Sequence, residues 1–562
     1  MMKNLMLKLS MFSVCILAGI SLKAQNQAIV KKYTRADTLR GTLTKERTWW
    51  DVQRYEISFA PDYMGKSIAG SNEIAYKVVK TNNGSLKMQI DLQEPLIIDS
   101  VIYNGKNKLK FTKNESIWLI TVPAQKIAAL NRVKIFYQGK VHQAKRAPWD
   151  GGFIFTQDSL KRPWMTVACQ GLGASVWFPN KDHQSDEPDK GASLTMTVPD
   201  TLVAVGNGRL VYKKQHSNGT ATYKYNVNSA INNYCIIPYI GKYVNFKEVY
   251  AGEKGPLDLN YWVLDYNLNK AKTFMPDQVH KMFKAFEYWF GPYPFYEDGY
   301  QLIDASHTGM EHQSAVSYGN KYKFGYGGRD ASGSGWGMKW DFIIIHESGH
   351  EWFGNNITTK DLADMWVHEG FTNYSETLFV DYHFGETAGN EYNYGIRKGI
   401  RNDQPIIPAY NVNAQGSGDM YPKGGNLLHS IKHGINNDEL FRSILRGLNA
   451  KFYHQTVTTA QVENYISTMA KFNYSKVFDQ YLRTTKIPTF NYYIADGKLY
   501  YQYKNCVEGF NLPLSLKANN QILKLVPTTA LQSIALKTGQ EQLFTKDAIE
   551  KMYYVKVEEG KL

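Results

Sequence analysis

Cysteine is scarce in this chain, with four residues among 562. They are Cys15, Cys169, Cys235 and Cys506, and no two of them lie close together in the sequence. A disulfide-rich secreted fold needs several closely spaced cysteines in a short chain, so that class is excluded. Cys169, Cys235 and Cys506 can form at most one disulfide bond, and three free thiols agree equally well with the spacing.

Long apolar runs are also missing after residue 24, because no later stretch reaches eighteen consecutive apolar residues. A helix that spans a membrane needs about 20 such residues. We therefore expect a soluble protein without stable membrane insertion.

Residues 1–24 have a different composition from the rest of the chain. Lys3 and Lys8 give this segment a positive start, residues 11–22 are mostly apolar, and the small Ala24 ends it. This order is typical of a cleaved signal peptide, so we predict export to the periplasm or secretion. A membrane anchor is disfavoured because the apolar run is too short to span a bilayer.

Lipid attachment at Cys15 is a weaker alternative for the same segment. The residue before it, Val14, is bulkier than such signals usually tolerate. The signal peptide therefore stays the preferred interpretation.

Dense clusters of basic residues are absent, although the net charge is +14. The lysines are spread along the chain, which is typical of a solvated surface, so we expect no nucleic-acid partner. Residues 325–337 are rich in glycine but contain no GxxxxGK[ST] pattern. A phosphate-binding loop of that kind is therefore not predicted.

Hydrophobic periodicity divides the chain into regions. Short runs with alternating apolar residues predict antiparallel sheet in residues 25–247, and the alternation returns in residues 488–562. Between them, residues 248–487 are mainly helical, and five apolar residues after Pro276 recur at helical spacing: Val279, Met282, Phe283, Phe286 and Phe290. We expect a multidomain α+β protein, since a chain of this length exceeds one core.

The central region contains His346-Glu347-Ser348-Gly349-His350. On a helix, His346 and His350 lie one turn apart on one face, so both imidazoles can bind one metal ion with Glu347 beside them. Alone, this HExxH pattern is weak evidence. Glu369 follows His350 by nineteen positions, in another helix-like segment. Two histidines and one carboxylate around zinc leave a fourth position for water, as in hydrolytic sites.

Together these residues resemble the M1 family of zinc aminopeptidases, which includes leukotriene A4 hydrolase. The family's HExxH motif continues as in His350–Asn355 (HEWFGN) and is followed by a glutamate at the spacing of Glu369. Further matches in family order are Trp177–Pro179, Asp186–Pro188 and Gly206–Gly208.

This resemblance implies an N-terminal antiparallel β saddle domain, a thermolysin-like, mainly helical zinc catalytic domain and a small C-terminal β domain. The sequence ends without the large helical domain that closes many members, so we expect none here.

The resemblance also implies roles for individual residues. His346, His350 and Glu369 would bind one zinc ion, and Glu347 would act as general base on a zinc-activated water. Tyr421, in Tyr421-Pro422-Lys423-Gly424, matches the tyrosine that binds the oxyanion. The implied activity is removal of the N-terminal residue from peptides.

Two further residues match positions that hold the substrate's amino end. Glu311 matches the glutamate of the family's Gly-Ala-Met-Glu-Asn motif, although Thr308, Gly309 and His312 depart from it. Gln170 precedes Pro179 by nine residues, where the family often places another such side chain. An amide that satisfies a strand edge is an equal alternative for Gln170.

Four residues in or near the motif have possible structural roles. Asp364 and Glu376 are the acids that could accept a hydrogen bond from a metal-bound histidine. His368 points about 100° away from Glu369 on a helix, so we expect it to pack rather than to bind metal. Gly349 could let a second helix approach closely.

Two other functions remain open at this point. A zinc endopeptidase would share the metal site without needing Glu311. A binding protein on an inactive M1 fold would have no chemical need for Glu347 and Tyr421 together with the metal ligands.

Overall fold

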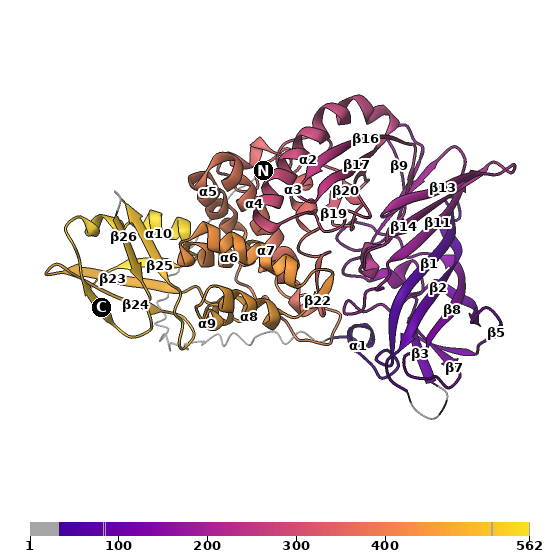
Figure 1. Cartoon of the computed structure of the whole chain (residues 1–562), viewed down its shortest axis with the longest axis horizontal. Coiled ribbons are helices and arrows are strands. Elements are labelled where there is room, and N and C mark those ends of the chain that lie inside the picture. The colour runs from indigo at the N-terminus through magenta and orange to yellow at the C-terminus, as the bar shows by residue number, and fades with distance from the viewer. Residues whose placement is uncertain (1–32, 82–83, 85, 519–520, 561–562) are drawn as a thin grey trace, which may run out of the picture.

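The computed structural model describes residues 33–81, 84, 86–518 and 521–560. The predicted signal peptide, residues 1–24, lies outside this part of the chain. Figure 1 shows sheets at one end, helices in the middle and a smaller sheet-containing region at the other end. This arrangement confirms the multidomain α+β class, and β and helical segments follow the predicted order.

Most of the N-terminal region forms an eight-stranded sheet in the order β13-β14-β11-β1-β2-β8-β4-β5. Neighbouring strands are antiparallel except β1 and β11, which are parallel. On β14, alternate residues from Ala221 to Val227 are buried, as the period of two predicts. The strands are β1 (Trp50–Asp62), β2 (Ser67–Val78), β4 (Ile97–Tyr103), β5 (Asn107–Lys108), β8 (Leu130–Lys140), β11 (Ala192–Pro199), β13 (Arg209–Gln215) and β14 (Thr220–Val227).

Two smaller sheets pack in the same region and share its core. One contains β3 (Leu86–Asp91), β7 (Ile117–Val122) and β6 (Phe111–Asn114). The other contains β12 (Val203–Val205), β15 (Tyr239–Gly241), β10 (Pro163–Ala168) and β9 (Gly152–Gln157). A short helix, α1 (Arg35–Gly41), precedes them and is closed by a capping box at Thr34.

A mixed five-stranded sheet joins this region to the helices, in the order β16-β17-β18-β20-β19. Its strands are β16 (Tyr243–Gly252), β17 (Gly255–Leu264), β18 (Tyr300–Asp304), β20 (Val316–Tyr318) and β19 (Gly309–Met310). The boundary that the sequence suggested between residues 247 and 248 therefore falls inside β16.

Helix α2 (Leu268–Phe290) packs against this sheet and is longer than the sequence pattern indicated. It begins before Pro276 and contains that residue, and Gly291 follows its last residue, Phe290. The other helices are α3 (Phe342–Gly349), α4 (Trp366–Phe384), α5 (Glu386–Ile396), α6 (Pro422–Ile435), α7 (Asp438–Lys451), α8 (Thr459–Met469) and α9 (Ser475–Arg483), with the short parallel pair β21 (Ile357–Thr359) and β22 (Gln455–Val457) between them.

The C-terminal region has a four-stranded sheet, a hairpin and one helix. They are β27 (Gln532–Ala535), β24 (Lys498–Lys504), β23 (Thr489–Ala495) and β28 (Lys556–Glu559), the hairpin β25 (Leu514–Ala518) and β26 (Gln521–Leu525), and α10 (Lys546–Met552). One continuous apolar core runs from Leu257 to Val557. The C-terminal strands therefore share a hydrophobic core with the helices.

Two sequence expectations concern features of the whole chain. Within the described residues, no helix is long and apolar enough to cross a bilayer. The three described cysteines, Cys169, Cys235 and Cys506, are free thiols.

Candidate metal and peptide-binding site

Helix α3 carries the first four HExxH residues, His350 follows at its C-terminal end, and Asp341 caps its N-terminus. The Asp341 carboxylate accepts hydrogen bonds from the backbone N–H groups of Ile343 and Ile344 at 2.9 and 3.1 Å. The Tyr318 hydroxyl donates to its other oxygen at 2.7 Å. Burial raises the pKa of Asp341 to about 7. Since the capped helix is buried, His346 and Glu347 project from a fixed scaffold.

His346, His350 and Glu369 converge, and their donor atoms all lie within 4.8 Å of one another. Glu369 Oε2 lies 3.4 Å from His350 Nε2 and 4.0 Å from His346 Nε2. That oxygen is buried and has no hydrogen-bond partner among the described residues. A buried carboxylate oxygen without a partner is costly, and a cation at this point would satisfy it. Two imidazoles and one carboxylate suit zinc.

The outer ring nitrogens of the two histidines are held by other side chains. His346 Nδ1 lies 2.7 Å from Glu376 Oε1, whose second oxygen accepts a 2.7 Å hydrogen bond from Tyr392. His350 Nδ1 lies 3.1 Å from both the Thr372 hydroxyl and the Phe353 carbonyl. With Nδ1 engaged, each ring turns Nε2 toward Glu369.

The other acid that the sequence suggested, Asp364, does not touch either histidine. It accepts a 2.8 Å hydrogen bond from the Tyr410 hydroxyl instead. His368 is buried and its Nε2 accepts from the Thr359 backbone N–H at 2.9 Å, so it packs as expected.

Gly349 lets α3 and α4 approach closely. A Cβ atom at this position would lie 2.6 Å from Ser375 Oγ on α4. Since this distance is shorter than an ordinary carbon–oxygen contact, a larger residue would force Ser375 to move, and glycine lets the two helices meet as they do.

Glu347 lies beside the three possible ligands and is itself buried. Its carboxylate is within 4.8 Å of ligand atoms of Glu311 and His350. Burial, the largest cause, raises the pKa of Glu347 to about 7, and the two histidines act in the opposite direction. A carboxylate with this position can accept and return a proton.

The departure from the family motif at Gly309 has a steric cause. A Cβ atom at this position would lie 2.5 Å from Glu347 Oε1 and 2.8 Å from Ile343 Cγ2. Glu347 and Ile343 therefore occupy the volume that an alanine side chain would fill.

Glu311 lies at the end of β19 with its carboxylate buried next to Glu347. Gln170 donates a hydrogen bond to Glu311 Oε1, and the Tyr234 hydroxyl donates to the same oxygen at 3.2 Å. Asn355, which belongs to the HEWFGN run, donates to the Glu311 carbonyl at 3.0 Å. Burial raises the pKa of Glu311.

Gln170 thus contacts a buried carboxylate rather than a strand edge. Sequence analysis did not identify Tyr234 as a site residue, because no motif distinguishes it among the 39 tyrosines. His312, the third departure from the motif, is buried, and its Nδ1 lies 2.6 Å from the Tyr239 hydroxyl. This contact anchors the segment next to Glu311.

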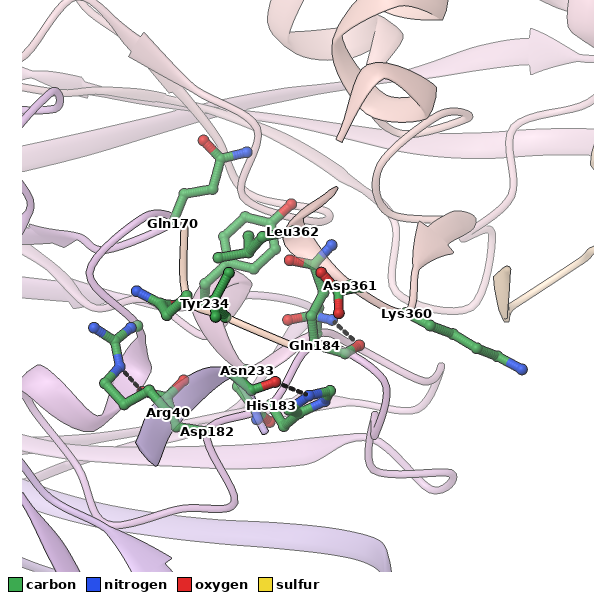
Figure 2. A pocket seen from close by; sticks show the side chains of 15 residues that line it. Arg40, Gln170, Asp182, His183, Gln184, Asn233, Tyr234, Lys360, Asp361 and Leu362 are labelled. Carbon is green, nitrogen blue, oxygen red and sulfur yellow. Dashed lines mark hydrogen bonds and ion pairs between the residues drawn. The ribbon is translucent and has the colours of Figure 1, made fainter. Parts of the chain in front are cut away.

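A small cavity adjoins these contacts of Glu311 and is drawn in Figure 2. Its volume is about 40 Å³, and Gln170 and Tyr234 both line it. Arg40 and Asp182, 3.9 Å apart, form another part of its wall. The two donors to Glu311 therefore border this cavity as well as the Glu311 carboxylate.

Tyr421 immediately precedes α6, with Pro422 at the first helical position. Its ring lies 6.2 Å from the His346 ring, between centroids, and nearly parallel to it. Burial and the neighbouring carboxylates Glu369 and Glu311 raise the pKa of Tyr421 well above its usual value. The hydroxyl therefore stays protonated and can donate a hydrogen bond.

All seven residues predicted for the site line one cleft of about 590 Å³. They are Gln170, Glu311, His346, Glu347, His350, Glu369 and Tyr421. The cleft also contains Trp149 from the N-terminal region and Arg401 from the segment before α6. The cleft can hold a small molecule or the end of a peptide.

Comparison with known proteins agrees with this geometry. Residues 274–481 match the model of the peptidase family M1 domain. The mouse endoplasmic reticulum aminopeptidase 1 is 21% identical over 362 residues, which are 62% of this chain and 38% of that protein. Dog aminopeptidase N is 24% identical over 330 residues, 54% of this chain and 32% of its own.

The leucyl aminopeptidase of Saccharolobus solfataricus is 20% identical over 84% of this chain and 59% of its own length. The chain thus spans between about a third and three fifths of these relatives. Among solved structures, a mutant of the M1 zinc metallopeptidase from Deinococcus radiodurans has a TM-score of 0.64 at 17% identity, covering 78% of this chain and 95% of that one. That similarity shows a common fold.

Proposed function

Because this chain belongs to peptidase family M1, we propose that it is a zinc aminopeptidase that removes the N-terminal residue from peptides. The observation that carries the proposal is Glu311, a buried carboxylate beside His350 and Glu347. It offers a negative charge where an endopeptidase would need space for the continuing backbone. A free α-ammonium matches this charge.

His346, His350 and Glu369 would hold the zinc ion, which fits the convergence of their donor atoms and the unpartnered Glu369 oxygen. When bound, zinc lowers the pKa of a water molecule to about 7 and polarises the carbonyl group of the substrate. Glu376 and Thr372 orient the two imidazoles.

Glu347 would take the proton of the attacking water and then return it to the nitrogen of the leaving peptide. Tyr421, protonated and close to His346, would donate a hydrogen bond to the oxyanion that forms at the former carbonyl. Gln170 and Tyr234 keep one Glu311 oxygen in place. The other oxygen then remains available for the ammonium group.

The finer assignments belong to the same proposal. We propose export through the predicted signal peptide, and the division into a β saddle domain, a thermolysin-like zinc domain and a small C-terminal β domain. A zinc endopeptidase or an inactive M1-fold binding protein would not need the buried Glu311 carboxylate.

The test compares one good peptide substrate with its N-acetylated form. Acetylation leaves Glu311 without its partner, so kcat/KM should fall by about 30-fold to several thousand-fold. The variant Glu311→Ala should show a smaller difference between the two peptides. Internal cuts that are insensitive to acetylation would instead indicate an endopeptidase, and zinc binding without any hydrolysis would indicate a binding protein.

A further inference from the structure

Charge is distributed unevenly along the cleft. Its lining includes three carboxylates at or beside the proposed metal site: Glu311, Glu347 and Glu369. Among the described residues that line the cleft, Arg401 is the single lysine or arginine. A cation in this lining is therefore a distinct feature that the proposed hydrolysis does not use.

Arg401 belongs to the wall that also carries Tyr421. Its backbone N–H donates to Asp419 Oδ1 at 2.9 Å, and the next N–H, of Asn402, donates to Asp419 Oδ2 at 2.6 Å. Asp419 is buried and lies two positions before Tyr421. The backbone of Arg401 is thus fixed to the segment that enters the cleft with Tyr421.

The amino terminus of a bound peptide would be held by residues other than Arg401. Gln170 and Glu311, which would hold the amino terminus, come from the N-terminal region and from β19. In the proposed mechanism the carbonyl to be cleaved would lie at the metal site of His346, His350 and Glu369. A longer peptide would continue into the rest of the cleft, whose lining includes Ile396, Gly399, Arg401 and Gly418.

The guanidinium group of Arg401 has free capacity for a ligand. Its side chain is 62% exposed, and its one ion pair among the described residues is Nη2 with Asp403 Oδ2 at 3.2 Å. Asp403 in turn accepts a hydrogen bond from Ser417, which fixes it next to Arg401. Guanidinium has five N–H donors in a planar fork that matches a carboxylate. Apart from Asp403, the described residues give these donors no partner, and Arg401 lines the cleft.

From this arrangement we propose that Arg401 binds the C-terminal carboxylate of short peptides. The preferred substrates are then small peptides with both ends free, one end at Glu311 and the other at Arg401. This proposal rests on the proposed aminopeptidase function.

The experiment uses peptides of two to six residues with a common N-terminal residue, each prepared as free acid and as C-terminal amide. The measured quantity is the ratio of kcat/KM for acid and amide in each protein. Wild type should prefer the acid by about ten-fold at the lengths that reach Arg401, as expected for a charge-assisted contact. The ratio should approach one in longer peptides, and it should decrease with added salt.

Substitutions identify the residue responsible. In Arg401→Gln the ratio should be close to one at every length, and in Arg401→Lys it should be intermediate because the charge remains but the fork is lost. Lys398→Gln is the matched control, since Lys398 is exposed, carries the same charge and does not line the cleft. Its acid-to-amide ratio should equal that of wild type.

An aminoacyl reporter without a carboxylate separates the two proposals. Reporter turnover together with an acid-to-amide ratio of one in wild type, or an unchanged ratio in Arg401→Gln, would overturn the role of Arg401 and leave the aminopeptidase proposal intact. Absence of any turnover would overturn the proposed function itself. In that case, equal binding of acid and amide peptides by calorimetry would still refute the Arg401 contact, and tighter binding of the acid would support it.

Discussion

Position 309 has room for a hydrogen atom but not for a methyl group. A Cβ atom there would lie 2.5 Å from the carboxylate oxygen of Glu347 and 2.9 Å from its Cγ. In the proposed mechanism Glu347 must reach both the water and the leaving nitrogen, so its role depends strongly on geometry. A displacement of about 1 Å in such a group can cost about 100-fold in rate.

We therefore predict that Gly309→Ala lowers kcat by about 10- to 100-fold while zinc content is retained. The measurements are steady-state kinetics and metal analysis of the same preparation. Gly560→Ala is a suitable control because an added Cβ there meets no atom within 4 Å. A normal kcat in Gly309→Ala would show that Glu347 tolerates displacement and would argue against its role as base.

The two carboxylates next to the histidines should also differ in what their removal does. In the proposed site Glu369 supplies a ligand atom, so Glu369→Ala should lose bound zinc and with it all activity. Glu347→Gln preserves the shape of the side chain and removes no metal ligand. Zinc should therefore remain, while kcat falls by at least about 100-fold. Metal analysis after dialysis distinguishes them, and the opposite outcome would exchange the two roles.

At the scale of elements, the site depends on how α3 begins and how closely α4 packs against it. Asp341 caps α3, and Gly349 permits the contact with Ser375 on α4. The cap is buried, and burial raises its pKa to about 7 from an unfolded value of about 4. The folded protein thus keeps this carboxyl group protonated over a range in which the unfolded chain ionises it.

This difference predicts the sign of a pH effect. The stability that the folded protein gains from protonated Asp341 is fully present below about pH 4. It is lost as the pH rises toward 7, because the unfolded chain binds fewer protons there. Asp341→Asn cannot ionise, so the Tm of wild type relative to this variant should decrease between pH 4 and pH 8. Thermal unfolding with a chelator present avoids metal release at low pH. A constant difference in Tm would show that folding does not raise the pKa of Asp341.

At the scale of the whole molecule, residues from distant parts of the chain meet at one cleft. Trp149 and Gln170 come from the N-terminal region, whereas His346, His350 and Glu369 come from α3, its C-terminal end and α4. The helices and the C-terminal strands share one core from Leu257 to Val557. A metal ion bound between α3 and α4 should therefore stabilise an extended part of the protein.

We predict that removal of zinc by a chelator lowers the Tm, since a ligand at about 100-fold its dissociation constant adds about 2.7 kcal/mol to the folded state. Differential scanning fluorimetry with and without chelator measures the change. Glu369→Ala is the control, because it has no complete site and its Tm should not respond. An equal response in both proteins would mean that the chelator acts elsewhere.

The sequence alone was sufficient for the features that depend on local spacing. Residues four apart on a helix share a face whatever surrounds them, so His346 and His350 could be paired from the sequence, and the run around Glu369 identified the third donor. Alternating apolar residues likewise predicted the strands of the N- and C-terminal regions. The family motif further indicated Glu311 and Tyr421.

Only the tertiary structure decided which distant side chains meet. It chose Glu376 over Asp364 as the partner of His346, and it added Tyr234 beside Glu311. It also explained Gly309, whose missing side chain leaves space for Glu347. These contacts join separate elements, and their distances depend on packing angles and loop paths, which residue spacing along the chain does not encode.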